Sequence, residues 1–233
     1  MKRKKLPDFV SNPLLVRLFQ SKPGRVLSNW VLQGMLYMNP IEIIYKLLLD
    51  LVLTVLFIFI FFQDPGIGDV IVALLLAHTT NWIINCQPVA LLMHIDIGKN
   101  DPHRFIQYIE GLERRIQGRP YLAAAASYGS LSKGCYRETS DIDIRFVLKD
   151  NILQRFQAAH YCFLERFRAL IHWFPLDLYA FSLEETLRKM NADEVPVIFV
   201  DPEGIIERNY ARTVPFGEFR KTFRANILGE TIS

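Results

Sequence analysis

Residues 121–148 read YLAAAASYGSLSKGCYRETSDIDIRFVL, and this stretch decides the fold of the C-terminal part of the chain. Its first eight residues are mostly small and apolar and lead into Gly129, as expected of a short buried strand that ends in a turn. Residues 141–148 alternate and are rich in β-branched residues, which predicts a second strand. Asp141 and Asp143 are two residues apart on that strand, so both carboxylates project from one face.

The residues around this pair of carboxylates point to phosphate and metal chemistry. Two adjacent carboxylates repel each other. A hard divalent cation that prefers oxygen ligands, typically Mg²⁺, is therefore the ligand expected between them. Gly129 permits a sharp backbone turn, and a Gly-Ser turn can hold phosphate oxygens through backbone N–H groups and the Ser130 hydroxyl. We therefore expect the phosphates of a nucleotide at this place.

The sequence around this stretch is typical of an α/β (α+β) domain. Apolar residues at helical spacing, and short β-branched or apolar runs, alternate along the chain. The expected helices are 103–117, 151–173 and 183–190, and the further expected strands are 176–181 and 195–200.

The motif resembles that of the polymerase-β-like nucleotidyltransferase superfamily, especially its minimal, MNT-like members. The matching residues are Gly129-Ser130, a spacer with Gly134, and Ser140-Asp141-Ile142-Asp143. The resemblance covers roughly residues 100–210 and implies the nucleotidyltransferase fold, a small mixed β-sheet flanked by helices. The family also places a third carboxylate on a later strand, a position that Asp177 fits.

The resemblance further implies a role for each of these residues. Asp141, Asp143 and Asp177 would hold Mg²⁺, with two ions expected and Mn²⁺ as an alternative. Asp177 would in addition deprotonate or orient the nucleophile of the acceptor. Gly129 and Ser130 would hold the leaving end of a nucleoside triphosphate such as ATP, so that a nucleoside monophosphate is transferred and pyrophosphate leaves.

Three basic residues near the motif have two interpretations each. Lys133 and Arg137 are candidates for phosphate contacts, with ordinary solvation of a loop as the alternative. Arg145 lies on the same strand face as Asp143. We interpret Arg145 as one member of a strand-edge charge pair, with bracing of the carboxylates or contact with substrate as the alternative.

The N-terminal part of the chain is basic and then strongly apolar. Residues 1–40 contain seven Lys or Arg residues and one acidic residue. Residues 41–62 are long enough to cross a hydrocarbon core, about 33 Å as a helix, and Lys46 and Asp50 are one turn apart, where they can pair or snorkel. Residues 69–95 form a second apolar segment that Pro88 kinks or ends.

Membrane attachment is the interpretation that we favour for these segments. They form either a transmembrane hairpin or one spanning helix with a re-entrant or interfacial partner; buried helices of a soluble protein are the alternative. The connection 63–69 contains no Lys or Arg, whereas both flanks are basic. The positive-inside rule then places both ends in the cytoplasm. We divide the chain into a membrane segment, 1–99, and a nucleotidyltransferase domain, 100–233, on the cytoplasmic side.

Composition excludes several classes of protein. A net charge of +3 over 233 residues gives no reason to expect a nucleic-acid partner, and three separated cysteines form neither a disulfide framework nor a zinc ribbon. The predicted partners are a nucleoside triphosphate, membrane lipid and an acceptor. In one form of this hypothesis the acceptor is linked to a lipid. The alternatives are an MNT-like enzyme that modifies a protein or a small molecule, and a non-catalytic nucleotide-sensing membrane protein.

Overall fold

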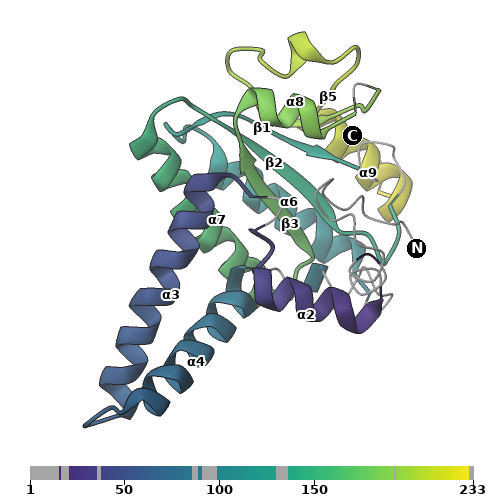
Figure 1. The fold of residues 1–233 in the computed structure, drawn as a ribbon. Coiled ribbons are helices and arrows are strands. Elements are labelled where there is room, and N and C mark those ends of the chain that lie inside the picture. The colour runs from purple at the N-terminus through teal and green to yellow at the C-terminus, as the bar shows by residue number, and fades with distance from the viewer. Residues whose placement is uncertain are drawn as a thin grey trace. The chain divides into compact units, whose positions relative to one another are not determined.

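The computed structural model describes two units of the chain, which we treat separately (Figure 1). Unit 1 comprises Met1–Pro88 and unit 2 comprises Val89–Ser233. The described residues are 16, 21–35, 38–85, 89–90, 99–129, 136–191 and 193–230.

The described part of unit 1 includes a short helix and a hairpin of two long helices. Helix α2 spans Lys22–Leu32, α3 spans Pro40–Phe61 and α4 spans Ile67–Asn85. Asn39 caps α3, because its side-chain oxygen accepts the backbone N–H of Glu42 at 3.0 Å. The two predicted apolar segments are thus both helical where they are described, and the predicted kink at Pro88 lies outside the described residues.

The hairpin buries small and polar residues and exposes most of its large apolar ones. The buried residues repeat every four positions, so they form one stripe on each helix. They are Glu42, Lys46, Asp50 and Thr54 on α3, and Ala73, Ala77, Asn81 and Asn85 on α4. The long aliphatic and aromatic side chains of both helices are mostly exposed. Both helices are long and apolar enough to cross a membrane.

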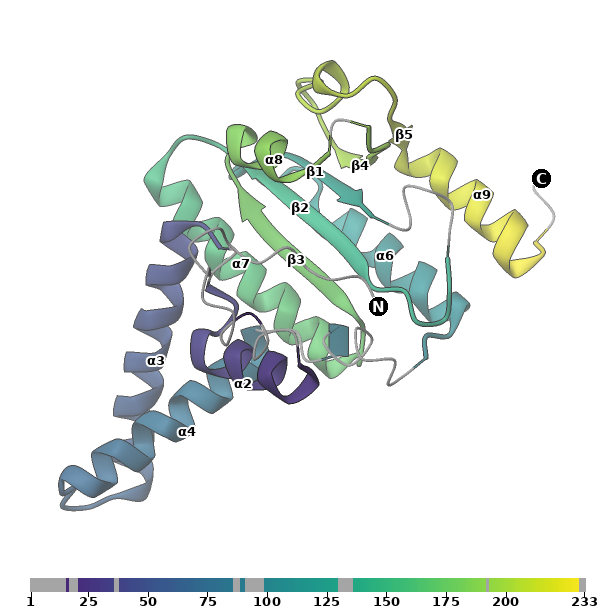
Figure 2. The ribbon, with the colours of Figure 1, turned by 45° about the vertical axis from the view of Figure 1, so that its right-hand side comes forward.

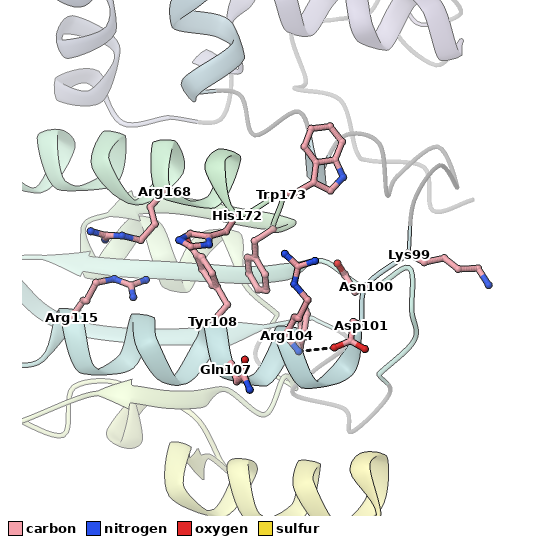
Figure 3. Close-up of a pocket in the computed structure, with 12 residues that line it drawn as sticks. Lys99, Asn100, Asp101, Arg104, Gln107, Tyr108, Arg115, Arg168, His172 and Trp173 are labelled. Carbon is pink, nitrogen blue, oxygen red and sulfur yellow. Dashed lines mark hydrogen bonds between the residues drawn. The ribbon is translucent and has the colours of Figure 1, made fainter.

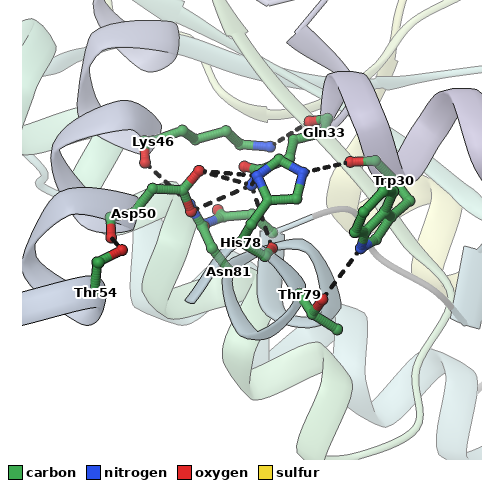
Figure 4. A network of polar contacts seen from close by, with 9 residues as sticks. Trp30, Gln33, Lys46, Asp50, Thr54, His78, Thr79 and Asn81 are labelled. Atoms are coloured by element: carbon green, nitrogen blue, oxygen red, sulfur yellow. Dashed lines mark hydrogen bonds and ion pairs between the residues drawn. The ribbon is translucent and has the colours of Figure 1, made fainter. Parts of the chain in front are cut away.

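A polar network joins the helices of unit 1 around Asp50 (Figure 4). The Asp50 carboxylate accepts hydrogen bonds from the side-chain amides of Gln33, at 3.0 Å, and Asn81, at 2.7 Å. It also lies 3.1 Å from Nδ1 of His78. Lys46 Nζ donates to the backbone carbonyl of Gln33 at 2.7 Å. Both Lys46 and Asp50 therefore point into the hairpin, and neither snorkels outward.

Unit 2 is a mixed α+β unit, as predicted (Figure 2). The helices are α6 (Pro102–Ile116), α7 (Ile152–Ile171), α8 (Leu183–Lys189) and α9 (Phe216–Leu228), with a 3₁₀ turn at Glu207–Asn209. The strands are β1 (Leu122–Tyr128), β2 (Ile142–Leu148), β3 (Leu176–Phe181), β4 (Val197–Val200) and β5 (Val214–Pro215). Strand β5 was not predicted, because two residues carry no periodicity.

The five strands form one mixed sheet in the order β3-β2-β1-β4-β5. Strands β2 and β3 run parallel, as do β4 and β5, whereas β1 is antiparallel to both of its neighbours. Helices α6, α7 and α9 bury the main core against one sheet face. Helix α8 and residues 205–210 cover part of the other face. The rest of that second face is where the polar residues of β2 and β3 lie.

Candidate functional site

Three aspartates from two neighbouring strands come together on one face of the sheet. Asp141 directly precedes β2, Asp143 lies within β2, and Asp177 lies within β3. Asp143 and Asp177 are register partners in the parallel pair. Each of the three residues offers a carboxylate oxygen, and these oxygens all lie within 4.8 Å of one another. The structure therefore places all three predicted metal ligands in one cluster.

The hydrophobic pattern of the two strands fixes this arrangement. Ile142 and Ile144 on β2, and Leu176 and Leu178 on β3, are fully buried in the main core. Because side chains alternate along a strand, these four residues turn the intervening aspartates to the opposite face. A slip of one residue in either strand would bury carboxylates in the core, so the register is strongly specified.

The cluster is crowded with negative charge. Burial and then the neighbouring charge of Asp177 raise the pKa of Asp143 well above its usual value, against the opposing effect of Arg145. The Asp177 side chain is 8% exposed and that of Asp143 is 29% exposed, so the cluster keeps an opening toward solvent. Three carboxylates at this spacing are the hard oxygen donors that Mg²⁺ prefers, and a bound cation would offset their repulsion.

Arg145 is a buried part of this cluster. The prediction of a strand-edge charge pair is wrong, because β2 lies inside the sheet between β3 and β1. Its guanidinium lies 3.4 Å from Asp143 and 3.8 Å from Asp177, and it donates to the backbone carbonyl of Asp177 at 3.1 Å. It also lies over the ring of Tyr179. Arg145 thus braces the carboxylates, which was the alternative interpretation.

Gly129 directly follows β1 and lies beside Asp143. Its φ of +82° is a conformation that L side chains rarely adopt, and a Cβ atom there would lie 2.6 Å from a carboxylate oxygen of Asp143. The Gly129 N–H lies 3.4 Å from a carboxylate oxygen of Glu194 and donates to it. Glu194 was not predicted, because it lies in the loop before β4, where no local sequence pattern marks a contact with Gly129.

The structure leaves the other predicted phosphate contacts open. Ser130, Lys133 and the Gly134 spacer lie outside the described residues. Arg137 is exposed, and its backbone N–H donates to the Ser140 hydroxyl at 3.0 Å. Among the described residues, no contact joins the Arg137 guanidinium to the acidic cluster, so its role remains a prediction.

Comparisons with known proteins provide no family assignment. No protein-family model matches the chain, and neither the curated proteins nor the solved structures include a significant match. The features that bear on function are therefore the geometry of the acidic cluster and the sequence motif.

Proposed function

We propose that the protein is a membrane-attached, Mg²⁺-dependent nucleotidyltransferase. It moves a nucleoside monophosphate from a nucleoside triphosphate to a hydroxyl or phosphate acceptor and releases pyrophosphate. The observation that carries this proposal is the convergence of Asp141, Asp143 and Asp177 beside Gly129 at the end of β1. The resemblance of the motif to the polymerase-β-like nucleotidyltransferases supports the choice of reaction.

Each group in the site has a defined task under this proposal. The three carboxylates hold the cations, and Asp177 also orients the nucleophile of the acceptor. Mg²⁺, when bound, neutralises phosphate charge and stabilises the attacking and leaving oxygens of an in-line displacement. Arg145 holds the carboxylates of Asp143 and Asp177 in place through its buried guanidinium. The protein thus acts mainly by positioning and by electrostatic stabilisation.

The interior of the hairpin supports membrane attachment. Helices of a soluble protein turn their apolar face inward, whereas α3 and α4 turn small and polar residues inward and apolar residues outward. This is the pattern expected in lipid, where small residues allow close helix packing and polar groups bond across the interface. We therefore propose that α3 and α4 cross the membrane as a hairpin with both ends in the cytoplasm.

Cysteine labelling tests this topology. In a chain whose native cysteines are replaced by alanine, we expect Asp64→Cys, in the α3–α4 connection, to react with a membrane-impermeant maleimide in intact cells. Glu203→Cys, in an exposed loop of unit 2, should react only after permeabilisation. Protection of Asp64→Cys in intact cells, in a chain that resists alkaline extraction from membranes, would show that the hairpin does not span.

Transfer of label tests the reaction and the acceptor. Membranes that contain the full chain are incubated with Mg²⁺ and each of the four ribonucleoside triphosphates, labelled in turn at the α-phosphate. We expect release of unlabelled pyrophosphate and the appearance of label in an organic-extractable lipid. Label in protein or in a soluble compound would support transfer but refute a lipid acceptor. Absence of pyrophosphate release with all four nucleotides would refute the proposed nucleotidyltransferase activity.

A further inference from the structure

A ridge of apolar side chains runs along the exposed side of α7. We define the α7 ridge as Leu153, Leu164, Phe167, Ile171 and the adjacent Trp173. The four helical positions fall on one stripe at a period of 3.6 residues. All five side chains are exposed, Ile171 by 65% and Trp173 by 58%, although α7 already buries its opposite side in the main core. The fold of unit 2 does not need this second apolar side.

A basic pocket opens beside the C-terminal end of the ridge (Figure 3). Its volume is about 320 Å³, and Trp173 belongs to both the ridge and the pocket wall. Four of its lining residues are Lys or Arg, whereas one is acidic; the basic residues are Lys99, Arg104, Arg115 and Arg168. His172 also lines it, and the stacked rings of Tyr108 and Phe174 form an aromatic wall.

The pocket keeps an excess of positive charge after its internal ion pairs are formed. Arg115 and Arg168 share a single carboxylate, that of the fully buried Glu165. Lys99 pairs with Glu138 at the surface. The Arg104 guanidinium extends from α6 and has no carboxylate partner among the contacts of the described residues (Figure 3). An anionic group is therefore the ligand that this pocket complements.

The chain itself limits how far this surface can be from the hairpin. Residues 86–98 join the end of α4 to Lys99 at the pocket rim. Such a linker spans at most about 45 Å when fully extended. If the hairpin crosses the bilayer, the ridge and the pocket are thus held near the membrane surface at high effective concentration.

We propose that the α7 ridge and the adjacent basic pocket form a docking surface for anionic phospholipid. The ridge enters the interfacial layer of the bilayer, where Trp is favoured, and the pocket receives a phosphate-bearing headgroup. This inference rests on the proposed membrane attachment and deepens the proposed function.

The pocket is close in sequence to the acidic cluster. Phe174 in the pocket wall precedes Asp177 by three residues, about 10 Å of extended chain. Asn100 in the pocket donates to the carbonyl of Ser140, next to Asp141. The pocket thus lies at the end of the sheet where β2 and β3 begin, on the side of α6 and α7, whereas the aspartates project from the opposite sheet face.

Depth-dependent fluorescence quenching tests this proposal on the full chain. The native cysteines are replaced by alanine, and a bimane label is attached to one new cysteine at a time. His160→Cys reports on the middle of the ridge stripe, Glu203→Cys on an exposed loop outside it, and Leu56→Cys on the outer side of α3. Each chain is reconstituted in vesicles of phosphatidylcholine and phosphatidylserine that contain lipids brominated on the acyl chains.

We expect strong quenching at positions 56 and 160 and weak quenching at position 203. Arg104→Gln should shift the docking equilibrium measured at position 160 by about fivefold, since one basic residue near an anionic surface contributes on that order. Arg220→Gln, the same charge change at an exposed position of α9, should leave it unchanged.

The three labels separate failure of this proposal from failure of membrane attachment. No quenching at position 56 would refute membrane insertion of the hairpin. Quenching at position 56 together with equal, weak quenching at positions 160 and 203 would refute docking alone. Protection of position 160 from aqueous iodide without quenching by brominated lipid would also refute it, because a protein surface, either the hairpin or a second copy, would then cover the ridge.

Discussion

Asp143→Asn is expected to lower Mg²⁺-dependent pyrophosphate release by roughly 10²–10³-fold or more, the usual loss when one preorganised electrostatic group is removed from such a site. The amide keeps the size of the side chain but removes one anionic ligand from the cluster. The measurement is the initial rate of pyrophosphate release by the reconstituted full chain.

The thermal stability of the same variant should not fall in parallel. In the metal-free protein, burial and the charge of Asp177 raise the pKa of Asp143, so its ionised form is disfavoured there. Replacing it with a neutral amide relieves that repulsion, and we expect an unfolding midpoint equal to or above that of the parent. Activity lost at unchanged or higher stability distinguishes a ligand from a residue that only maintains the fold.

Asp150→Asn is the matched control for this prediction. Asp150 is highly exposed just after β2 and pairs with Arg155 at the surface, outside the acidic cluster. Its substitution makes the same chemical change and should leave the rate within about twofold of the parent, since exposed pairs contribute little. Equal rates in Asp143→Asn and the parent would instead favour a nucleotide-sensing protein without catalysis.

The sequence alone predicted the elements that a local pattern encodes. The alternation of residues 141–148 predicted β2 and put Asp141 and Asp143 on one face, because side-chain direction along a strand depends only on period. The aliphatic run of residues 41–62 predicted α3 within one residue at each end. Asp177 was found only through the resemblance, since no local feature links it to Asp141, which lies 36 positions earlier.

Features that depend on distant pairing were not accessible in this way. The burial of Arg145 follows from the position of β2 inside the sheet. The order of the strands cannot be predicted from the sequence of any single strand. The contact between Glu194 and Gly129 joins two loops. The inward direction of Asp50 depends on the pairing of α3 with α4, which presents Asn81 and His78 to it. The Lys46 side chain instead meets the backbone carbonyl of Gln33, which directly follows α2.

Arg145→Met should destabilise the metal-free protein and make its stability strongly dependent on Mg²⁺. The substitution keeps an apolar stem but removes the buried cation that faces Asp143 and Asp177. Removing one partner from a buried ionic cluster costs about 3–5 kcal/mol. For a chain of this size, that cost corresponds to a fall of roughly 10 °C in the unfolding midpoint.

Mg²⁺ should then restore part of this loss. A cation that binds the folded state stabilises it by mass action, and it does so more when no arginine already offsets the charge of its ligands. We therefore expect Mg²⁺ to raise the midpoint of Arg145→Met more than that of the parent, as measured by calorimetry of the full chain in detergent. Arg220→Met, which removes an exposed cation from α9, should show the Mg²⁺ response of the parent. A response of Arg145→Met no larger than that of the parent would mean that the three aspartates do not hold the cation, because their unbalanced charge would then have no effect on its binding.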